Sequence, residues 1–154
     1  MTTLTSISIH SVYVLDQDEA LDFYVGTLGF EVDADVDMGF MRWLTIRLPA
    51  DPTRSILLSL PGGPMMSASA ATAVRDLLTQ GALGMAANLT TDDCVALHAE
   101  LAAKGVEFTQ EPTEQPYGID CALRDPFGNH IRITQLTPMR PITDDDLQRW
   151  APDA

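Results

Sequence analysis

The sequence predicts an α+β fold made of two tandem copies of one strand-helix-strand-strand-strand unit. Three observations lead to this prediction: period-two alternation of apolar residues, helix start and stop signals, and a set of identities at one spacing. Because the identities lie at matching helix caps, helix faces and helix stops, chance is a poor explanation for them. The five pairs, each separated by 76 residues, are Asp16 and Asp92, Ala20 and Ala96, Leu21 and Leu97, Gly29 and Gly105, and Glu31 and Glu107.

The first copy is predicted over residues 7–60 and opens with an alternating strand at 7–15. Asp16 is placed to cap a helix at 18–28, and Gly29 is placed to end it. The remaining segments of this copy are extended and separated by turn residues, and they lie at residues 30–32, 40–48 and 55–60.

Residues 61–84 are predicted to be a linker, because they begin with Pro-Gly-Gly-Pro and continue into small residues that allow one short helix. Residues 137–154 lie outside the repeat as a C-terminal tail, in which Thr143 starts another short helix. The second copy spans residues 85–136. It is expected to contain a strand at 85–90, a helix at 95–104 capped by Thr91 or Asp92, and strands at 106–110, 118–124 and 130–136.

A tight turn, Asp125-Pro126-Phe127-Gly128-Asn129, leads into the last of these strands. Pro126 presets φ at the second turn position, and Gly128 tolerates positive φ. Apolar and polar residues alternate in the strand that follows. The turn therefore sets the register of this strand and the face on which Arg132 lies.

A chain of 154 residues with 45% hydrophobic content is expected to form a single domain over residues 1–154. Its formal charge is −13, from 22 acidic residues against 9 Lys and Arg. This balance repels phosphate backbones and anionic lipids, so we expect no nucleic-acid or membrane partner, whereas a cationic small molecule would be attracted. Acidity that serves only solubility is the simpler interpretation.

Signals for export, membrane insertion or a disulfide scaffold are not found in the sequence. The N-terminal segment has no basic region, and no stretch approaches the ~20 apolar residues of a membrane span. Cys94 and Cys121 fall at no metal or redox spacing, so both are expected to be reduced, buried thiols. A cytoplasmic location is therefore expected.

Three segments carry a family resemblance. They are residues 16–30, with Asp-Phe-Tyr and Leu-Gly-Phe motifs, residues 102–108, with Lys-Gly-Val-Glu-Phe, and the Asp-Pro-Phe-Gly-Asn turn. On these segments the chain resembles the vicinal oxygen chelate superfamily of glyoxalases, bleomycin-resistance proteins and extradiol dioxygenases. The resemblance implies two βαβββ modules that form a curved, barrel-like mixed sheet around a central cavity, and a homodimer.

The resemblance also implies where metal-dependent members hold a cation, on the first and last strands of each module. In this sequence the positions fall on Ile9 and Met85 in the first strands, on an apolar residue among 56–58, and on Arg132 in the final strand. None of these suits a hard divalent cation, because they offer no lone pair, a soft thioether or a fixed positive charge. A one-residue slip would bring in only His10. We therefore expect no metal and no other cofactor.

By alternation, one face of each module is expected to line the cavity. Ile9 and Tyr13 would contribute from the first module, and Met85, Ala87 and Leu89 from the first strand of the second. A lining of apolar and aromatic side chains with a few polar groups suits a small organic ligand. The predicted ligand-binding residues are Ile9, Tyr13, Trp43, Met85, Tyr117 and Arg132.

These predicted roles have alternatives. Trp43 and Tyr13 would serve equally well as ordinary core residues. Tyr117, near Asp120, is expected at the rim, since a tyrosine of ordinary pKa is a poor general acid near neutrality. An inward Arg132 implies either an internal carboxylate or a ligand with an anionic or carbonyl group.

Two classes of function follow from the sequence, and whether the chain is an enzyme stays open. The first is a metal-independent small-molecule-binding protein of the glyoxalase/bleomycin-resistance type, with drug sequestration as one version. The alternative is a lyase, isomerase or dioxygenase-like enzyme with an unrecognised metal site or a metal-free site. A subunit whose cavity is filled by its own side chains is a third interpretation, since this fold serves unrelated chemistry.

Overall fold

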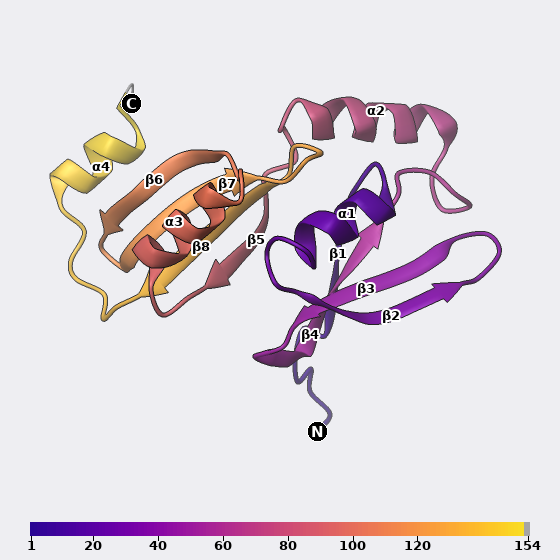
Figure 1. Ribbon diagram of the computed structural model, residues 1–154, viewed down its shortest axis with the longest axis horizontal. Helices are drawn as coiled ribbons and strands as arrows, with labels where there is room; N and C mark the ends of the chain where they lie inside the picture. Colours follow the sequence, from indigo (N-terminus) through magenta and orange to yellow (C-terminus); the bar gives the residue numbers. More distant parts are fainter. Residues whose placement is uncertain (153–154) are drawn as a thin grey trace. The chain divides into compact units, whose positions relative to one another are not determined.

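The computed structural model describes residues 1–152, and the chain divides into two compact units. One unit comprises residues 1–84 together with 125–129, and the other contains residues 85–124 and the segment that follows residue 129. Each unit holds one four-stranded sheet with both parallel and antiparallel neighbours (Figure 1). The predicted α+β fold of two tandem βαβββ modules is therefore confirmed.

Four strands and two helices build the first unit: β1 (Ile9–Tyr13), α1 (Gln17–Tyr24), β2 (Glu31–Asp37), β3 (Arg42–Leu48), β4 (Asp51–Ser59) and α2 (Ala68–Thr79). The strand order is β1-β4-β3-β2, and β1 runs parallel to β4. One face of this sheet packs against α1, where the Gln17 side chain donates to the Leu58 carbonyl at 2.8 Å. Leu44, Ile46 and Leu58 are fully buried on this face. The face of each sheet that lies opposite the helix of its own βαβββ module, here α1, is called the open face.

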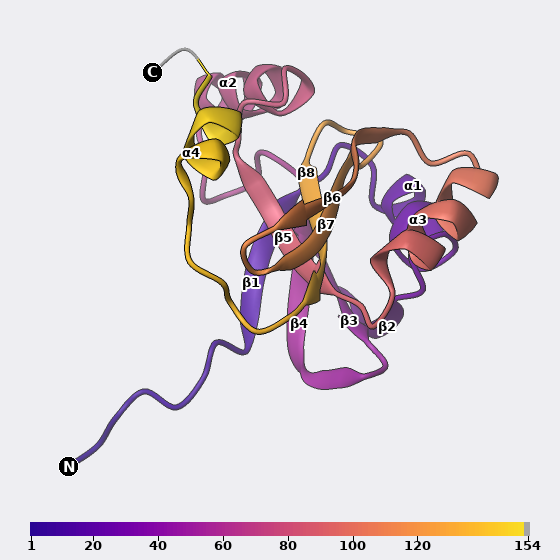
Figure 2. The same cartoon turned by 90° about the vertical axis from the view of Figure 1, so that its left-hand side faces the viewer.

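Four strands and two helices also build the second unit: β5 (Met85–Thr90), α3 (Cys94–Ala103), β6 (Phe108–Gln115), β7 (Gly118–Arg124), β8 (His130–Leu136) and α4 (Asp144–Trp150). The strand order is β5-β8-β7-β6. Figure 2 shows α3 and α4 on opposite sides of this sheet. Of the predicted tail 137–154, the last two residues lie outside the described part of the chain. No helix within residues 1–152 is long and apolar enough to cross a bilayer.

The helices begin at side-chain caps, as the sequence predicted, with one correction. Asp16 caps α1, and Thr143 caps α4 in a reciprocal capping box. The cap of α3, however, is Asp93, whose carboxylate accepts from the backbone N–H of Ala96, the third helical residue, at 2.9 Å. The prediction of Thr91 or Asp92 at this position is wrong by one or two residues.

A β-bulge at Ala86 accounts for a one-residue shift in the second unit. The register steps from Met85 to Ala87 while β8 advances by a single residue, so Ala86 is inserted between the paired positions. Beyond the bulge, Ala87 and Leu89 pair with the isoleucines of β8 that lie under α3, and Asn88 takes the open face of the sheet. The prediction that Ala87 and Leu89 share the face of Met85 is therefore wrong, because simple alternation does not count an inserted residue.

The turn at residues 125–129, which joins β7 to β8, belongs to the first unit. One oxygen of Asp125 accepts from the three backbone N–H groups of residues 127–129 at 2.9 to 3.0 Å. Tyr24 of α1 donates its hydroxyl to the other oxygen at 2.7 Å, and the Asn129 amide donates to the Tyr13 carbonyl at 2.7 Å. The turn that sets the register of β8 is thus held by α1 and β1.

Candidate functional site

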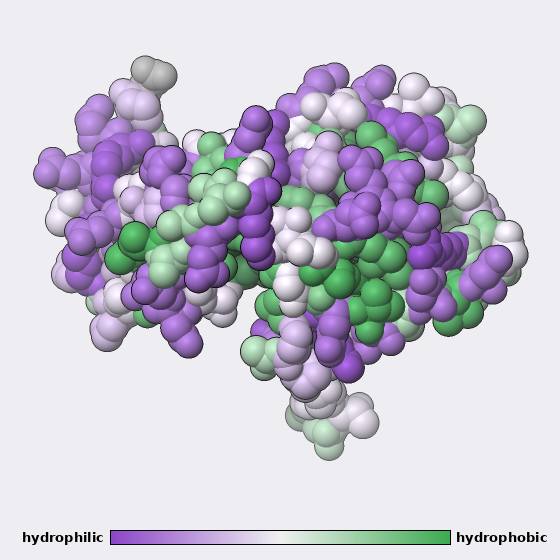
Figure 3. All heavy atoms as spheres, viewed as in Figure 1, coloured by the Kyte–Doolittle hydropathy of each residue, from purple (hydrophilic) through white to green (hydrophobic). Residues whose placement is uncertain are grey.

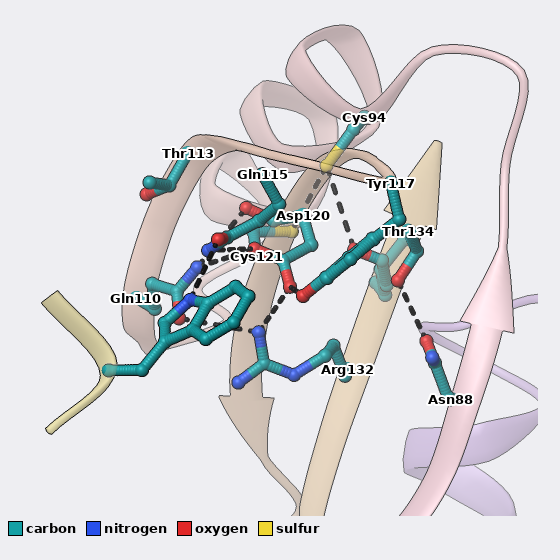
Figure 4. Close-up of polar contacts among 12 residues, drawn as sticks. Asn88, Cys94, Gln110, Thr113, Gln115, Tyr117, Asp120, Cys121, Arg132 and Thr134 are labelled. Carbon is teal, nitrogen blue, oxygen red and sulfur yellow. Dashed lines mark hydrogen bonds and ion pairs between the residues drawn. The ribbon is translucent and has the colours of Figure 1, made fainter. Parts of the chain in front are cut away.

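On the open face of the second sheet, Asp120 of β7 is enclosed by hydrogen-bond donors (Figure 4). Tyr117 Oη donates to its Oδ2 at 2.7 Å, and Gln110 Nε2 donates to its Oδ1 at 2.7 Å. Gln115 Nε2 lies 3.3 Å from Oδ1, and Arg132 Nη1 of β8 forms an ion pair with Oδ2. The Asp120 side chain has no solvent exposure, whereas the Arg132 side chain is 32% exposed.

The pKa values follow from these contacts. Burial by itself would raise the pKa of Asp120, but the hydrogen bonds from Tyr117, Arg132 and Gln110 outweigh it, and the pKa lies below its ordinary value. Burial and the hydrogen bond to Asp120 both raise the pKa of Tyr117. Tyr117 therefore stays a neutral phenol and Asp120 a carboxylate near neutrality. The pair is poorly suited to exchange a proton with a substrate at that pH.

Asp120 is the internal carboxylate, one of the two alternative partners predicted for Arg132 from the sequence. Arg132 lies opposite Asn88 of β5 in the parallel ladder, and the corresponding position of the first unit is Leu57, opposite Ser11 of β1. On the last strand of each module, metal-dependent members of the resembled superfamily carry a metal ligand. At these positions this chain has Leu57 in the first module and Arg132 in the second.

Two features of this cluster were missed by sequence reasoning. Gln110 and Gln115 are ordinary residues on a strand, and no motif marks them as partners of Asp120. The contribution of α4 was missed as well: Trp150 Nε1 donates to Gln115 Oε1 at 3.1 Å, and Arg149 donates to the Glu114 carbonyl at 3.1 Å. The C-terminal helix is therefore tied to β6, on the open side of the sheet.

The first unit contains a pocket of about 450 Å³, formed where β1 and β4 lead into their loops and β3 begins. Hydrophobic residues gather at the surface of this unit (Figure 3). Among the described residues that line the pocket, none is Asp or Glu. The large apolar and aromatic side chains in the lining are Tyr13, Leu15, Phe40, Met41, Leu60, Met65 and Met66.

The polar groups of the pocket are largely engaged with the protein. Gln17 donates to main-chain carbonyls of β3 and β4 at 3.2 and 2.8 Å, and the Ser59 hydroxyl lies 3.0 Å from that of Ser11. Arg75 of α2 donates to the Pro61 carbonyl at 2.8 Å. This last bond ties α2 to the loop that forms one wall of the pocket.

The six predicted binding residues fall into two groups of three. Ile9, Tyr13 and Trp43 lie on the open face of the first sheet, and only Tyr13 of these lines the pocket. Tyr117 and Arg132 meet at Asp120 in the second unit, and Met85 is exposed at the start of β5. A single cavity lined by all six residues stays a prediction.

No group of three or more His, Cys, Asp or Glu side chains that could hold a metal ion occurs within residues 1–152. Cys94 and Cys121 are buried free thiols, which confirms the prediction made for them. Their sulfur atoms lie 3.6 Å apart, and burial raises the pKa of Cys121 to about 12. Neither thiol is therefore a ready nucleophile.

Comparisons with known proteins place these features in a family. The family model that describes the Glyoxalase/Bleomycin resistance protein/Dioxygenase superfamily by its sequences matches residues 6–133 of this chain. YurT of Bacillus subtilis (strain 168) is 34% identical over 129 residues, which are 84% of this chain and 98% of YurT. The crystal structure of UcmS2 matches with a TM-score of 0.81 and 32% identity over 86% of this chain and 99% of UcmS2. TnmS3, an antibiotic binding protein from Streptomyces sp. CB03234, matches with a TM-score of 0.70 and 31% identity over 89% of this chain and all of TnmS3.

Proposed function

The chain belongs to the Glyoxalase/Bleomycin resistance protein/Dioxygenase superfamily, and from this premise we propose that it is a metal-independent protein that binds a small organic molecule. Sequestration of an antibiotic is the version that its similarity to the antibiotic binding protein TnmS3 favours. The proposal includes a homodimer of the chain in the cytoplasm, as expected from the sequence.

The pocket of the first unit carries this proposal. Its volume of about 450 Å³ lies within the range of small-molecule sites, and its lining is mainly apolar and aromatic with a few polar groups. Three of its side chains, Met41, Met65 and Met66, are methionines. Methionine side chains adapt to ligands of irregular shape, so this lining suits an organic molecule better than an inorganic ion.

Metal independence is supported by the residues at the four strand positions discussed above. Ile9 and Leu57 offer no lone pair, and Met85 offers only a thioether. Arg132, the fourth, is a permanent cation, and it is held in place by Asp120. A divalent cation at this position would be repelled by the guanidinium.

The net charge of the chain and the charged groups of the pocket lining favour different ligands. The net charge of −13 favours a cation. The described lining, however, includes no carboxylate. Of its two arginines, Arg42 is already paired with Asp18 and Asp35, whereas the Arg75 guanidinium donates to the Pro61 carbonyl. Because close charges act more strongly than distant, screened ones, we propose a neutral or anionic ligand for this pocket.

Calorimetric titration with a panel of neutral, anionic and cationic antibiotics tests the proposal. Met41→Trp fills the pocket and is expected to abolish binding, whereas Met139→Trp, at a position that is 66% exposed and outside the lining, should leave binding unchanged. Silence of the wild-type protein across the panel would argue against the proposed function. Equal binding by both variants would place the ligand elsewhere.

Metal analysis separates the binding protein from an enzyme of the alternative class. The purified chain is dialysed against manganese, nickel, zinc and iron in turn, and its metal content is measured after exhaustive washing. We expect no stoichiometric retention. Retention of one metal ion per chain would overturn metal independence. Light scattering during size-exclusion chromatography tests the homodimer in the same samples.

A further inference from the structure

The guanidinium of Arg132 uses only part of its hydrogen-bonding capacity. Its Nη1 donates to Asp120 and, at 3.4 Å, to Gln110 Oε1. No protein group within residues 1–152 accepts a hydrogen bond from its Nε–H or Nη2–H. These two donors share one edge of the planar guanidinium, and that edge matches the two oxygens of a carboxylate.

Arg42 in the first unit shows how this edge behaves beside a carboxylate. Its Nε and Nη2 donate to the two oxygens of Asp35 at 2.8 and 2.9 Å, while its Nη1 donates to Asp18 at 2.7 Å. The Arg42 side chain is 30% exposed, close to the 32% of Arg132. One guanidinium of this chain therefore holds two carboxylates at once, at an exposure that Arg132 shares.

The edge of Arg132 is oriented before any ligand arrives. Asp120 is fully buried and is held by Tyr117 and Gln110 as well as by Arg132, so it anchors the guanidinium from the protein side. The neighbour of Arg132 on β7 is Ala122, whose side chain is a single methyl group. A donor pair held in this way loses little conformational entropy on binding.

We infer that the Nε and Nη2 edge of Arg132 binds the carboxylate of a small organic acid, with Asp120 as the positioning residue. The inference goes beyond the function proposed for the first unit, because it names a ligand-binding position in the second unit, and its test does not depend on the pocket. The negative net charge does not preclude this, because charges beyond about 8 Å are largely screened at physiological ionic strength. A neutral carbonyl compound would meet the same edge with one oxygen instead of two and bind more weakly.

The test is an NMR titration that observes arginine Nε–H resonances at constant ionic strength. Benzoate is the probe, and benzamide is its neutral counterpart of the same shape. We expect benzoate to shift the Arg132 Nε–H resonance in a saturable manner and benzamide to leave it nearly unchanged. The Nε–H of Arg42 serves as an internal control, because Asp35 already occupies that edge.

Variants assign the effect to the side chain. Arg132→Lys keeps the positive charge but lacks the two-donor edge, and it is expected to weaken benzoate binding severalfold, as is Arg132→Gln. If benzoate and benzamide bind alike and Arg132→Gln changes neither, the inference is wrong while a small-molecule site elsewhere still stands. If neither probe moves Arg132 although the antibiotic panel binds, the inference fails alone. Failure of the proposed function is read separately, from the pocket variant Met41→Trp.

Discussion

At the scale of the residue, Asp120 combines a buried negative charge with an ion pair. Its carboxylate is fully buried, and its cationic partner Arg132 lies at the surface of the open face. Tyr117, Gln110 and Arg132 all donate to this carboxylate, so an amide in its place would present an NH2 group to a donor and leave buried hydrogen-bonding groups unsatisfied. Loss of one member of an exposed ion pair carries no such cost. The stability of the second unit therefore depends on this carboxylate.

We predict that Asp120→Asn lowers the free energy of unfolding by roughly 3 kcal/mol. The matched control is Asp35→Asn, because Asp35 also pairs with an arginine but is 41% exposed, and its loss should cost much less. Urea denaturation followed by circular dichroism measures both. Equal effects of the two substitutions would contradict the importance assigned to burial at Asp120.

The lowered pKa of Asp120 also predicts how stability changes with pH. A carboxyl group whose pKa is lower in the folded state contributes stability above its unfolded pKa of about 3.9, and this contribution is lost as pH falls through the folded pKa. Asp146 behaves in the same way, since hydrogen bonds from Arg140 and from the Thr143 backbone lower its pKa. We expect the unfolding free energy to fall on acidification below about pH 4, and to fall less steeply in Asp120→Asn. Urea titrations at several pH values measure both slopes, and parallel slopes would contradict the assignment.

At the scale of the element, the turn 125–129 is constrained by a close approach as well as by hydrogen bonds. Gly128 has a φ of +115°, and a Cβ at this position would lie 2.2 Å from the Leu78 carbonyl oxygen. Gly29 also has positive φ, at +84°, but a Cβ there would meet nothing within 4 Å. Substitution of Gly29 would therefore cause backbone strain alone, whereas substitution of Gly128 would cause both backbone strain and a steric clash.

We predict that Gly128→Ala destabilises the protein by about 3 kcal/mol or more, and Gly29→Ala by about 1 to 2 kcal/mol. Both substitutions force alanine into a positive-φ conformation, but only the first also drives a methyl group into the main chain of α2. Thermal and urea unfolding of the two variants give the comparison. A smaller loss in Gly128→Ala than in Gly29→Ala would show that the turn can move away from Leu78.

The sequence predicted the elements well because their signals are local. The bounds of β5, β7 and β8 agree with the predicted strands residue for residue, and Asp16 caps the first helix as expected. The faces of Ala87 and Leu89 were predicted wrongly because of the residue inserted at Ala86. A bulge is defined by the pairing of two strands, so alternation along one strand gives no sign of it.

At the scale of the whole molecule, the candidate sites were harder to predict than the elements. Strand alternation identified the faces of Tyr13 and Arg132, because a face depends only on register. The pocket depends on the loop after β4, where Gly62 and Gly63 adopt φ values of +124° and +77°. A loop path of this kind is decided by tertiary contacts such as the bond from Arg75, and residue types alone do not specify it.

The assignment of the turn 125–129 to the first unit means that no single cut separates the two units intact. A fragment of residues 1–84 lacks Asp125 and Asn129, so the Tyr24 hydroxyl and the Tyr13 carbonyl lose partners that lie 2.7 Å away in the whole chain. Each loss at a buried polar group costs about 1 to 3 kcal/mol, a large share of the stability of a small domain.

We therefore predict that the fragment of residues 1–84 shows no cooperative urea transition by circular dichroism, whereas the full chain does. Addition of a synthetic peptide of residues 120–134 should restore a transition, because the peptide supplies the turn that α1 and β1 hold. The control peptide carries Asp125→Ala and Asn129→Ala and should restore nothing. Cooperative unfolding of the fragment by itself, at the midpoint of the full chain, would show that the turn follows the fold of the first unit without stabilising it.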